Sequence, residues 1–261
     1  MAIIACCNHY ASCPIVATPI MRAPVWLFDL DNTLHDASYA IFPAISANMN
    51  LYIARVLAQH GLPAHQAAVD AARLGYWKRY GATLLGMMRH HKVRAADFLR
   101  ETHEIGPLDR LMRAERGLAR LLRRLPGRKI LLTNAPTRYS SEIVRRLKLH
   151  HHFAHHVAIE HMQVHGQLRP KPSKLMLRRL LRRHKASPGR CILVEDTLAN
   201  LKSASQLGLR TVWVTQYLRM GEPAGKPGPR LPARRTLRRP GYVDVKVKSV
   251  RQLPARLHRL R

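Results

Sequence analysis

An apolar segment that ends abruptly in two carboxylates is the feature of this sequence that most limits its possible folds. The run VWLFDLDNTL places Asp29 and Asp31 directly after a row of large apolar side chains. Such a pair is unusual here, because the chain has only 15 acidic residues against 45 basic ones. A second apolar run, at residues 191–194, ends in Glu195 and Asp196. Parallel strands bring their carboxyl ends to one edge of a sheet, so we expect these four acids to lie together.

Strand and helix signals alternate along the chain. Apolar runs typical of buried strands occur at residues 25–30, 129–132, 157–159, 192–194 and 211–214, and an alternating segment typical of an edge strand at 242–247. Helix-length segments lie between them, at residues 139–147, 173–184 and 198–207. This order is typical of a parallel sheet, and we predict an α/β fold.

A long helical segment interrupts the alternation after the first strand. From about residue 42 to residue 125, apolar residues recur three and four positions apart, as in Leu51, Val56 and Leu57. A chain of 261 residues is long enough for one domain with a large insertion. We therefore expect a flexible leader at 1–24, a core at 25–36 and 126–220, a helical insertion at 37–125, a loop rich in Pro, Gly and Arg at 221–240, and a core edge strand with a tail helix at 241–261.

Composition narrows the class of protein. Apolar residues make up 46% of the chain, which excludes a wholly disordered protein. We find no apolar stretch that approaches the roughly 20 residues of a membrane-spanning helix, and we expect a cytoplasmic protein with no membrane partner. Cys6, Cys7 and Cys13 lie in the leader and Cys191 begins an expected strand, so no disulfide framework is indicated. Together with His9, the three leader cysteines fit no common zinc spacing.

A further strand end and a turn between two prolines carry groups that suit an anion. Thr133 and Asn134 follow the apolar run ILL, which places a hydroxyl and backbone N–H groups at the end of the second long strand. Lys171 lies between Pro170 and Pro172, in a stiff turn ahead of a helix, and offers an ammonium group. We therefore expect these groups to bind a phosphate.

The acids at the other strand ends suit a metal and covalent chemistry. Carboxylate oxygens of Asp29, Glu195 and Asp196 form a hard donor set of the kind that Mg²⁺ prefers. Asp29 could attack phosphorus to form an aspartyl phosphate, while Asp31 protonates the leaving oxygen and later takes a proton from the hydrolytic water. A metal and a lysine would offset the repulsion between two anions. The predicted reaction is hydrolysis of a phosphate monoester.

Four short motifs resemble those of a known superfamily. DLDNTL, LLTNA, RPKP and VEDTLAN stand in the order and at the spacings typical of the haloacid dehalogenase (HAD) superfamily of phosphatases, over about residues 25–214. NTLHDAS, YWKRYGATLLGMMRHH and VEDTLANLKSA further resemble the pyrimidine 5′-nucleotidase branch. The resemblance implies a Rossmann-like core with an inserted all-helical cap of the C1 type, dependence on Mg²⁺, and a nucleoside 5′-monophosphate as substrate.

The resemblance also implies roles for individual residues. Asp29 would be the nucleophile and Asp31 the acid and base. The Asp31 backbone carbonyl and Asp196 would complete the metal site, and Thr133 and Lys171 would hold the phosphoryl group.

Three more positions follow from the same comparison of motifs. Glu195 would ligate the metal directly or through water. Asn200 would position Lys171 or Asp196 from the first turn of a helix. Ser173 stands where relatives often have an acidic residue, which leaves the start of the following helix without its usual capping group.

Residues that set substrate specificity are expected in or near the cap. Tyr76, Trp77 and Tyr80 could stack on a base, although aromatic residues at helical spacing more often belong to a core. His35 could touch substrate, but a partly exposed loop histidine is the commoner outcome.

A run of histidines invites a metal interpretation, and we expect a solvated loop instead because no helical pair has an acidic partner. The run comprises His150, His151, His152, His155 and His156, with His161 and His165 beyond.

The net charge of +30 supports a rival function, binding of nucleic acid by a basic protein on a hydrolase fold. We rank it below catalysis, because the arginine doublets are spread over several helices and every catalytic position is filled. Nucleic acid is then expected only as a non-specific polyanion. Sugar phosphates and phosphoglycolate remain alternative substrates, and dehalogenation an alternative reaction of the same nucleophile.

Overall fold

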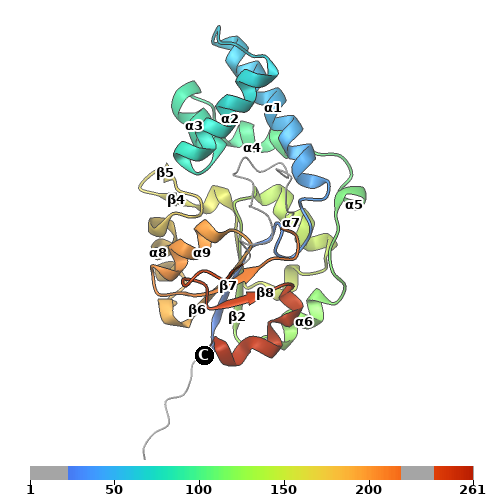
Figure 1. Ribbon diagram of the computed structural model, residues 1–261, viewed down its shortest axis with the longest axis vertical. Helices are drawn as coiled ribbons and strands as arrows, with labels where there is room; N and C mark the ends of the chain where they lie inside the picture. Colours follow the sequence, from blue (N-terminus) through green and yellow to red (C-terminus); the bar gives the residue numbers. More distant parts are fainter. Residues whose placement is uncertain (1–22, 219–237, 261) are drawn as a thin grey trace, which may run out of the picture.

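The computed structural model describes residues 23–218 and 238–260 and has a six-stranded sheet flanked by helices, with a helical cap above it (Figure 1). The strands run in the order β3-β2-β1-β6-β7-β8, and every neighbouring pair is parallel. They are β1 (Val25–Phe28), β2 (Arg128–Leu132), β3 (His155–Val157), β6 (Cys191–Glu195), β7 (Arg210–Val214) and β8 (Val245–Val247). The predicted α/β, Rossmann-like fold is confirmed.

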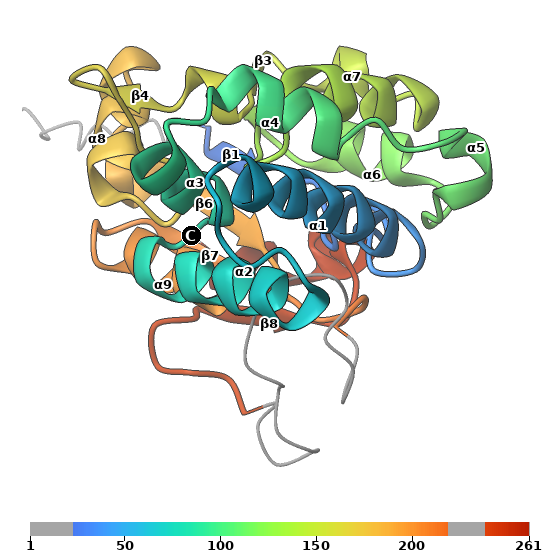
Figure 2. The ribbon, with the colours of Figure 1, turned by 90° about the horizontal axis from the view of Figure 1, so that it is seen from above.

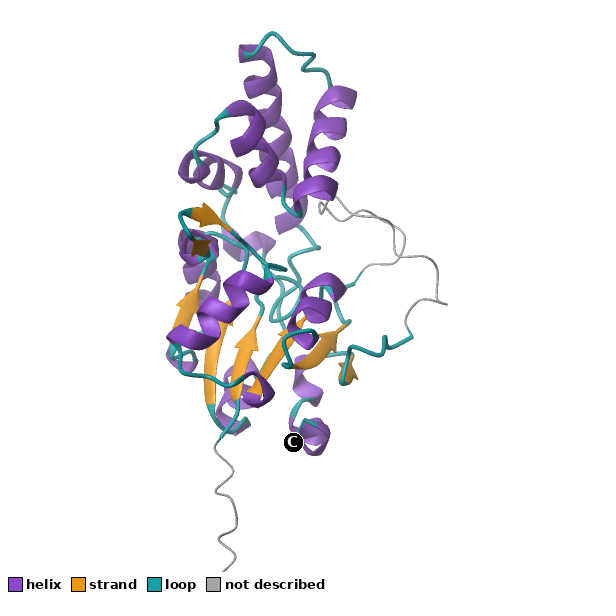
Figure 3. Cartoon of the chain, turned by 90° about the vertical axis from the view of Figure 1, so that its left-hand side faces the viewer, coloured by secondary structure: helices purple, strands orange, loops and turns teal. Residues whose placement is uncertain are grey.

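The central strands β1 and β6 are buried along their whole length, which explains why they read as continuous apolar runs. In the sheet register, Phe28 pairs with Leu131 of β2 and with Val194 of β6. The residues that follow these strands therefore meet at one edge of the sheet. This edge faces the cap (Figure 3).

Helices cover both faces of the sheet: α6 (Leu118–Arg124), α7 (Thr137–Arg146), α8 (Lys174–Arg183) and α9 (Leu198–Ser205). Trp26 and Phe28 point to the face covered by α6 and α7, and Val25 and Leu27 point to the face covered by α8 and α9. Figure 2 shows the two helix layers on either side of the strands. The three helices predicted in the core are present, and Gly208 adopts the expected left-handed conformation with φ 82°.

The insertion after β1 is helical and forms the cap: α1 (Ile41–Gln59), α2 (Gln66–Tyr80), α3 (Thr83–His91), α4 (Ala95–Thr102) and α5 (Leu108–Leu111). Its hydrophobic core is separate from the two clusters on the sheet and includes Ile53, Met87 and Phe98. The sequence-based division assigned residues 37–125 to the cap. The structure instead packs α6 against the sheet, because Leu118 and Leu122 belong to the cluster around Trp26.

Helix α1 corrects one expectation. It has 19 residues and is long and apolar enough to cross a membrane by length and composition. One helix of this kind is weak support for a membrane protein, because core helices pass the same test. Ile53 and Leu57 on α1 pack into the cap core, and Ile41 and Ile45 pack into the core of the sheet.

Other segments differ in detail from the prediction. The strand expected at 157–159 ends at Val157, and Ile159–His161 form a 3₁₀ helix. A hairpin of β4 (Gln163–Val164) and β5 (Gln167–Leu168) was not expected. Its turn residues, His165 and Gly166, both have positive φ, as a tight type I′ turn requires.

At the C-terminus, the expected tail helix is a pair of 3₁₀ helices, Val250–Gln252 and Pro254–Arg259. Residues 1–22 of the expected leader, which include its three cysteines, and most of the loop at 221–240 lie outside the described residues.

Candidate active site

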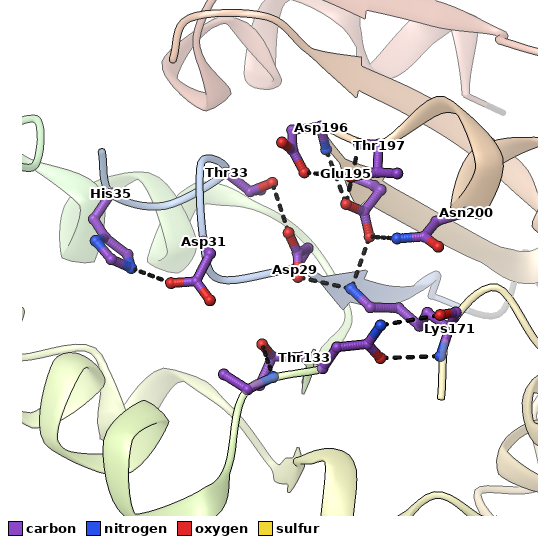
Figure 4. Close-up of polar contacts among 12 residues, drawn as sticks. Asp29, Asp31, Thr33, His35, Thr133, Lys171, Glu195, Asp196, Thr197 and Asn200 are labelled. Carbon is purple, nitrogen blue, oxygen red and sulfur yellow. Dashed lines mark hydrogen bonds and ion pairs between the residues drawn. The ribbon is translucent and has the colours of Figure 1, made fainter. Parts of the chain in front are cut away.

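Three of the four acids meet at the sheet edge below the cap (Figure 4). The Asp29 main chain continues the pairing of β1 with β6, since its N–H donates to the Val194 carbonyl over 3.0 Å. Carboxylate oxygens of Asp29, Glu195 and Asp196 all lie within 4.8 Å of one another, and the three residues are buried. The parallel sheet therefore gathers these acids as expected, whereas the Asp31 carboxylate turns toward other partners.

Lys171, in the turn before α8, lies beside the acid cluster. Its Nζ lies 2.7 Å from Asp29 Oδ1 and 2.7 Å from Glu195 Oε2, and only 4% of the residue is exposed. Burial by itself would lower the pKa of the Lys171 ammonium, but the charges of Asp29 and Glu195 outweigh burial and raise that pKa. Lys171 is therefore a permanently charged group beside the Asp29 carboxylate.

Asn134 fixes the main chain of Lys171. The Lys171 N–H donates to Asn134 Oδ1 over 2.9 Å, and Asn134 Nδ2 donates to the Lys171 carbonyl over 3.0 Å. The peptide bond that follows, between Lys171 and Pro172, is cis. The Asn134 side chain thus holds the lysine in place, and binding of a phosphate by the backbone N–H groups at this strand end stays a prediction.

Glu195 accepts hydrogen bonds on both carboxylate oxygens. Oε1 accepts from the N–H groups of Asp196 and Thr197, and Oε2 accepts from Lys171 Nζ and from Asn200 Nδ2 over 2.9 Å. Asn200 therefore acts on Glu195, and through it on Lys171. This degree of engagement is typical of a carboxylate that positions its neighbours.

Thr133 lies at the end of β2 and is 1% exposed. Its N–H donates to the Val157 carbonyl, and its Oγ1 accepts from the Ala135 N–H over 3.1 Å, so the hydroxyl proton remains to be donated. Ser173 caps α8 by accepting from the Met176 N–H over 3.3 Å. Ser173 therefore supplies the N-terminal capping group of α8 in place of the acidic residue that relatives often have.

Asp31 lies in a tight loop after β1 and has its own partners. Asn32 adopts a left-handed conformation with φ 60°, which asparagine tolerates better than most residues. Asp31 Oδ1 accepts from the Tyr139 hydroxyl over 2.7 Å and contacts His35 Nε2 over 2.9 Å. His35 is fully buried and not partly exposed as expected, and it contacts the predicted acid and base because the loop folds it beside Asp31.

Tyr139 is a site residue that the sequence analysis missed. It stands near the start of α7 and is 108 positions from Asp31 in sequence. Burial, followed by the charge of Asp31, raises the pKa of the Tyr139 hydroxyl well above its usual value. The only available signal was its place six residues after Thr133, on the helix that follows a motif strand.

Tyr139 also contacts the cap. Its ring centroid lies 5.6 Å from that of His103, which follows α4. Burial lowers the pKa of His103 to about 4, although the charge of Asp31 opposes the shift. The neutral imidazole therefore packs where cap and core meet.

The donor set fits a divalent cation. Three buried carboxylates, those of Asp29, Glu195 and Asp196, lie close together beside the ammonium of Lys171. Clustered carboxylate oxygens of this kind are the ligands that a hard dication prefers, and its charge would offset the repulsion among them. Within the described residues, this is the one group of three or more His, Cys, Asp or Glu side chains close enough to share an ion.

The cap aromatics make contacts inside the cap. The Tyr76 hydroxyl lies 2.6 Å from His91 Nε2, and the Tyr80 hydroxyl lies 2.6 Å from His90 Nε2. A Cβ at Gly86 would collide with the Tyr76 ring, so this glycine lets α2 and α3 approach. Trp77 is half-buried. Packing between α2 and α3 accounts for Tyr76 and Tyr80 without a substrate.

The histidine run does not form the predicted loop. His150–His152 form a 3₁₀ helix, and His155 and His156 lie in β3. His156 Nε2 lies 2.8 Å from Ser140 Oγ, and the His155 ring packs on His184 at 4.4 Å. These contacts explain His156 as a packing residue, whereas His155 is exposed, as expected of a solvated histidine.

Residues 25–208 match the haloacid dehalogenase-like hydrolases, and since this match spans more than half of the chain, the protein belongs to that family. It is therefore a hydrolase of the HAD type, as the four motifs predicted.

Solved structures share the fold at low sequence identity. A HAD phosphatase from Thermococcus onnurineus is 14% identical, with 90% of this chain and 97% of that chain covered and a TM-score of 0.57. The HAD hydrolase YfnB from Bacillus subtilis, solved bound to magnesium, is 16% identical over 90% and 99%, with a TM-score of 0.52. An L-2-haloacid dehalogenase from Xanthobacter autotrophicus is 14% identical over 91% and 99%, with a TM-score of 0.51. At such identities the likeness concerns the fold alone.

Proposed function

We propose that this HAD hydrolase is a Mg²⁺-dependent phosphomonoesterase that works through an aspartyl phosphate on Asp29. The observation that carries the proposal is the buried contact of Asp29 with Lys171, beside Asp196 and two positions before an independently held Asp31. A carboxylate nucleophile and a phosphate repel each other, and the lysine ammonium is placed to reduce that repulsion.

The proposed reaction has two steps. An Asp29 carboxylate oxygen attacks phosphorus, the bond from phosphorus to the ester oxygen breaks, and Asp31 gives that oxygen a proton to release an alcohol. Asp31 then takes a proton from water, whose oxygen attacks the phosphorus of aspartyl phosphate and frees Asp29 with inorganic phosphate. Thr133 and Lys171 would hold the phosphoryl oxygens in both steps.

The metal would be held by Asp29, Asp196 and the backbone carbonyl of Asp31, with Glu195 adjacent. When bound, it would supply positive charge that stabilises the phosphoryl oxygens. Glu195, which already accepts from Lys171 and Asn200, is better suited to keep the lysine in place than to bind the ion directly.

Dehalogenation by the same nucleophile is the nearest alternative reaction, and the Xanthobacter protein of the same fold is a dehalogenase. A halide leaves without a proton, whereas an alkoxide needs one. Asp31, held by Tyr139 and His35, is placed to supply that proton, which favours phosphate esters.

Binding of nucleic acid is supported less well by the distribution of charge. Arg123 and Arg124 lie on α6 and Arg145 and Arg146 on α7, whereas four more arginines lie on α8 across the sheet. A positive field spread over both helix layers would draw in small anions from all sides, but it does not form one strip for a polymer.

The proposed substrate is a nucleoside 5′-monophosphate, with a pyrimidine base preferred. The proposal rests on the motif resemblance to pyrimidine 5′-nucleotidases. Sugar phosphates and phosphoglycolate are the alternatives within the same chemistry.

Release of inorganic phosphate from a panel of nucleoside monophosphates, sugar phosphates and phosphoglycolate, with and without Mg²⁺, tests the proposal. Asp29→Asn is the inactive control. The matched control is Asp70→Asn, which changes a partly buried acid whose partners Gln66 and Arg73 lie on the same helix, α2. Selective turnover of pyrimidine monophosphates supports reaction and substrate together. Turnover of another ester keeps the reaction and rejects the substrate, and no turnover of any ester by folded, metal-loaded protein rejects both.

A further inference from the structure

The carboxylate of Asp31 receives two contacts on one oxygen. Tyr139 reaches Oδ1 from α7 over 2.7 Å, and His35 Nε2 reaches the same atom from the β1 loop over 2.9 Å. Tyr139 is 4% exposed and His35 is not exposed at all. Both contacts to Asp31 therefore come from buried groups and not from mobile side chains at the surface.

The chemistry of the three groups sets the direction of both hydrogen bonds. An ionised carboxylate can only accept, and a phenol with its ordinary pKa of about 10 donates at neutral pH. His35 must then carry its proton on Nε2 when Asp31 is charged. Two donors that converge on Oδ1 stabilise the negative charge on that oxygen and fix the plane of the carboxylate.

We propose that Tyr139 and His35 are positioning residues that orient Asp31 for proton transfer to the leaving oxygen. The inference rests on the proposed phosphomonoesterase function and adds two residues to it. The proton that passes to the ester oxygen leaves a carboxyl group whose plane these two donors fix. The Asp31 carboxylate then receives a proton of the hydrolytic water in the second step, so the carboxyl group returns to its protonated starting state.

Tyr139 connects this orientation to the cap. Its ring packs against His103 after α4, and both residues line a cavity of about 440 Å³ between α4 and α7. A shift of the cap at this contact would move the phenol that holds Asp31. His35 lies on the β1 loop, so the two donors hold Asp31 from two different elements of the core.

The test uses a property that only proton transfer to the leaving group affects. The value of kcat/KM reports events up to the release of the alcohol, in which Asp31 acts as the acid. p-Nitrophenyl phosphate has a leaving group that departs without a proton, whereas a nucleoside 5′-monophosphate has an alkoxide leaving group that needs one. The ratio of kcat/KM for the two esters therefore measures the contribution of the acid.

Tyr139→Phe removes the hydroxyl and keeps the ring that packs on His103. We expect kcat/KM for the nucleoside monophosphate to fall about 10- to 100-fold, with a fall below about threefold for p-nitrophenyl phosphate. The matched control is Tyr52→Phe, which removes a hydroxyl from a tyrosine of the cap core and leaves both values unchanged. The second donor is tested with two variants of His35. The ratio of kcat/KM for the nucleoside monophosphate to that for p-nitrophenyl phosphate should fall less in His35→Gln, which keeps an N–H near the position of Nε2, than in His35→Ala.

An equal fall for both esters in Tyr139→Phe, or no fall in either, would overturn the inference while leaving the phosphomonoesterase proposal intact. A wild-type protein that releases phosphate from neither p-nitrophenyl phosphate nor any ester of the substrate panel would reject the function and the inference with it. A ratio that His35→Gln and His35→Ala lower equally would remove His35 from the proposal and leave Tyr139.

Discussion

Lys171 Nζ lies 2.7 Å from Asp29 Oδ1, and the two residues are only 4% and 5% exposed. A buried ion pair of this kind depends on both partners, since the loss of one leaves the other as an uncompensated charge. Glu195 adds a second carboxylate at the same distance from the ammonium. The Lys171 ammonium is thus expected to contribute both to the stability of the fold and to the reaction at Asp29.

Replacement of this lysine should therefore affect stability and activity together. Lys171→Met leaves Asp29 and Glu195 facing each other, and we expect the free energy of unfolding to fall by about 3–5 kcal/mol. Phosphate release should fall at least about 100-fold. Urea unfolding and turnover measure the two effects, and Lys174→Met on α8 is the control. A variant of full stability and activity would show that the ion pair matters for neither.

Asn134 offers a milder test of the same arrangement. Asn134→Ala removes both hydrogen bonds to the Lys171 main chain, and we expect a loss of about 1–3 kcal/mol in unfolding free energy. We also expect turnover to fall about tenfold, since Lys171 loses its placement. If phosphate affinity changes while stability does not, the Asn134 side chain binds substrate directly, which would contradict this positioning role.

Metal binding should stabilise the folded protein. With Mg²⁺ at 100 times its dissociation constant, linkage predicts an increase of about 2.7 kcal/mol in unfolding free energy. Asp196→Asn should reduce this increase, whereas Asp70→Asn should not. Thermal unfolding at graded Mg²⁺ concentrations measures the effect without turnover. An equal increase in all three proteins would place the ion elsewhere.

His103 predicts a pH dependence of stability. Its folded pKa of about 4 lies below the ordinary value, so the unfolded chain binds more protons between that pKa and about 6.5. The contribution is fully present above about pH 6.5 and is lost as the pH falls toward 4, by at most about 3 kcal/mol. Unfolding free energies at pH 7 and 4.5 should differ less in His103→Gln than in the wild type. Equal slopes would contradict the assignment.

Much of the fold was predictable because its central strands are buried on both faces. Such strands read as unbroken apolar runs, and their carboxyl ends had to meet, which placed Asp29 beside Glu195. Lys171 was predictable from its motif. Its main-chain partner Asn134 was not, because a hydrogen bond between residues 37 positions apart depends on how the loops pack.

The surroundings of Asp31 show the same limit. His35 reads as an ordinary loop residue, and only the left-handed turn at Asn32 brings it under the carboxylate. The sequence pattern places Tyr139 on the apolar face of a helix. Its hydroxyl reaches Asp31 because α7 packs on the face of the sheet to which Trp26 and Phe28 point. The assignment of α6 to the sheet likewise rests on tertiary packing that a helical period does not reveal.

Direct detection of phosphate on Asp29 is the measurement that tests the central claim most closely. The protein is mixed with a phosphate ester that it hydrolyses, quenched in acid within one turnover, and digested for mass spectrometry. We predict a phosphorylated peptide that contains Asp29 and its absence in Asp29→Asn, which should also be inactive. Hydrolysis that continues in Asp29→Asn, with no phosphate on the wild-type peptide, would contradict the account.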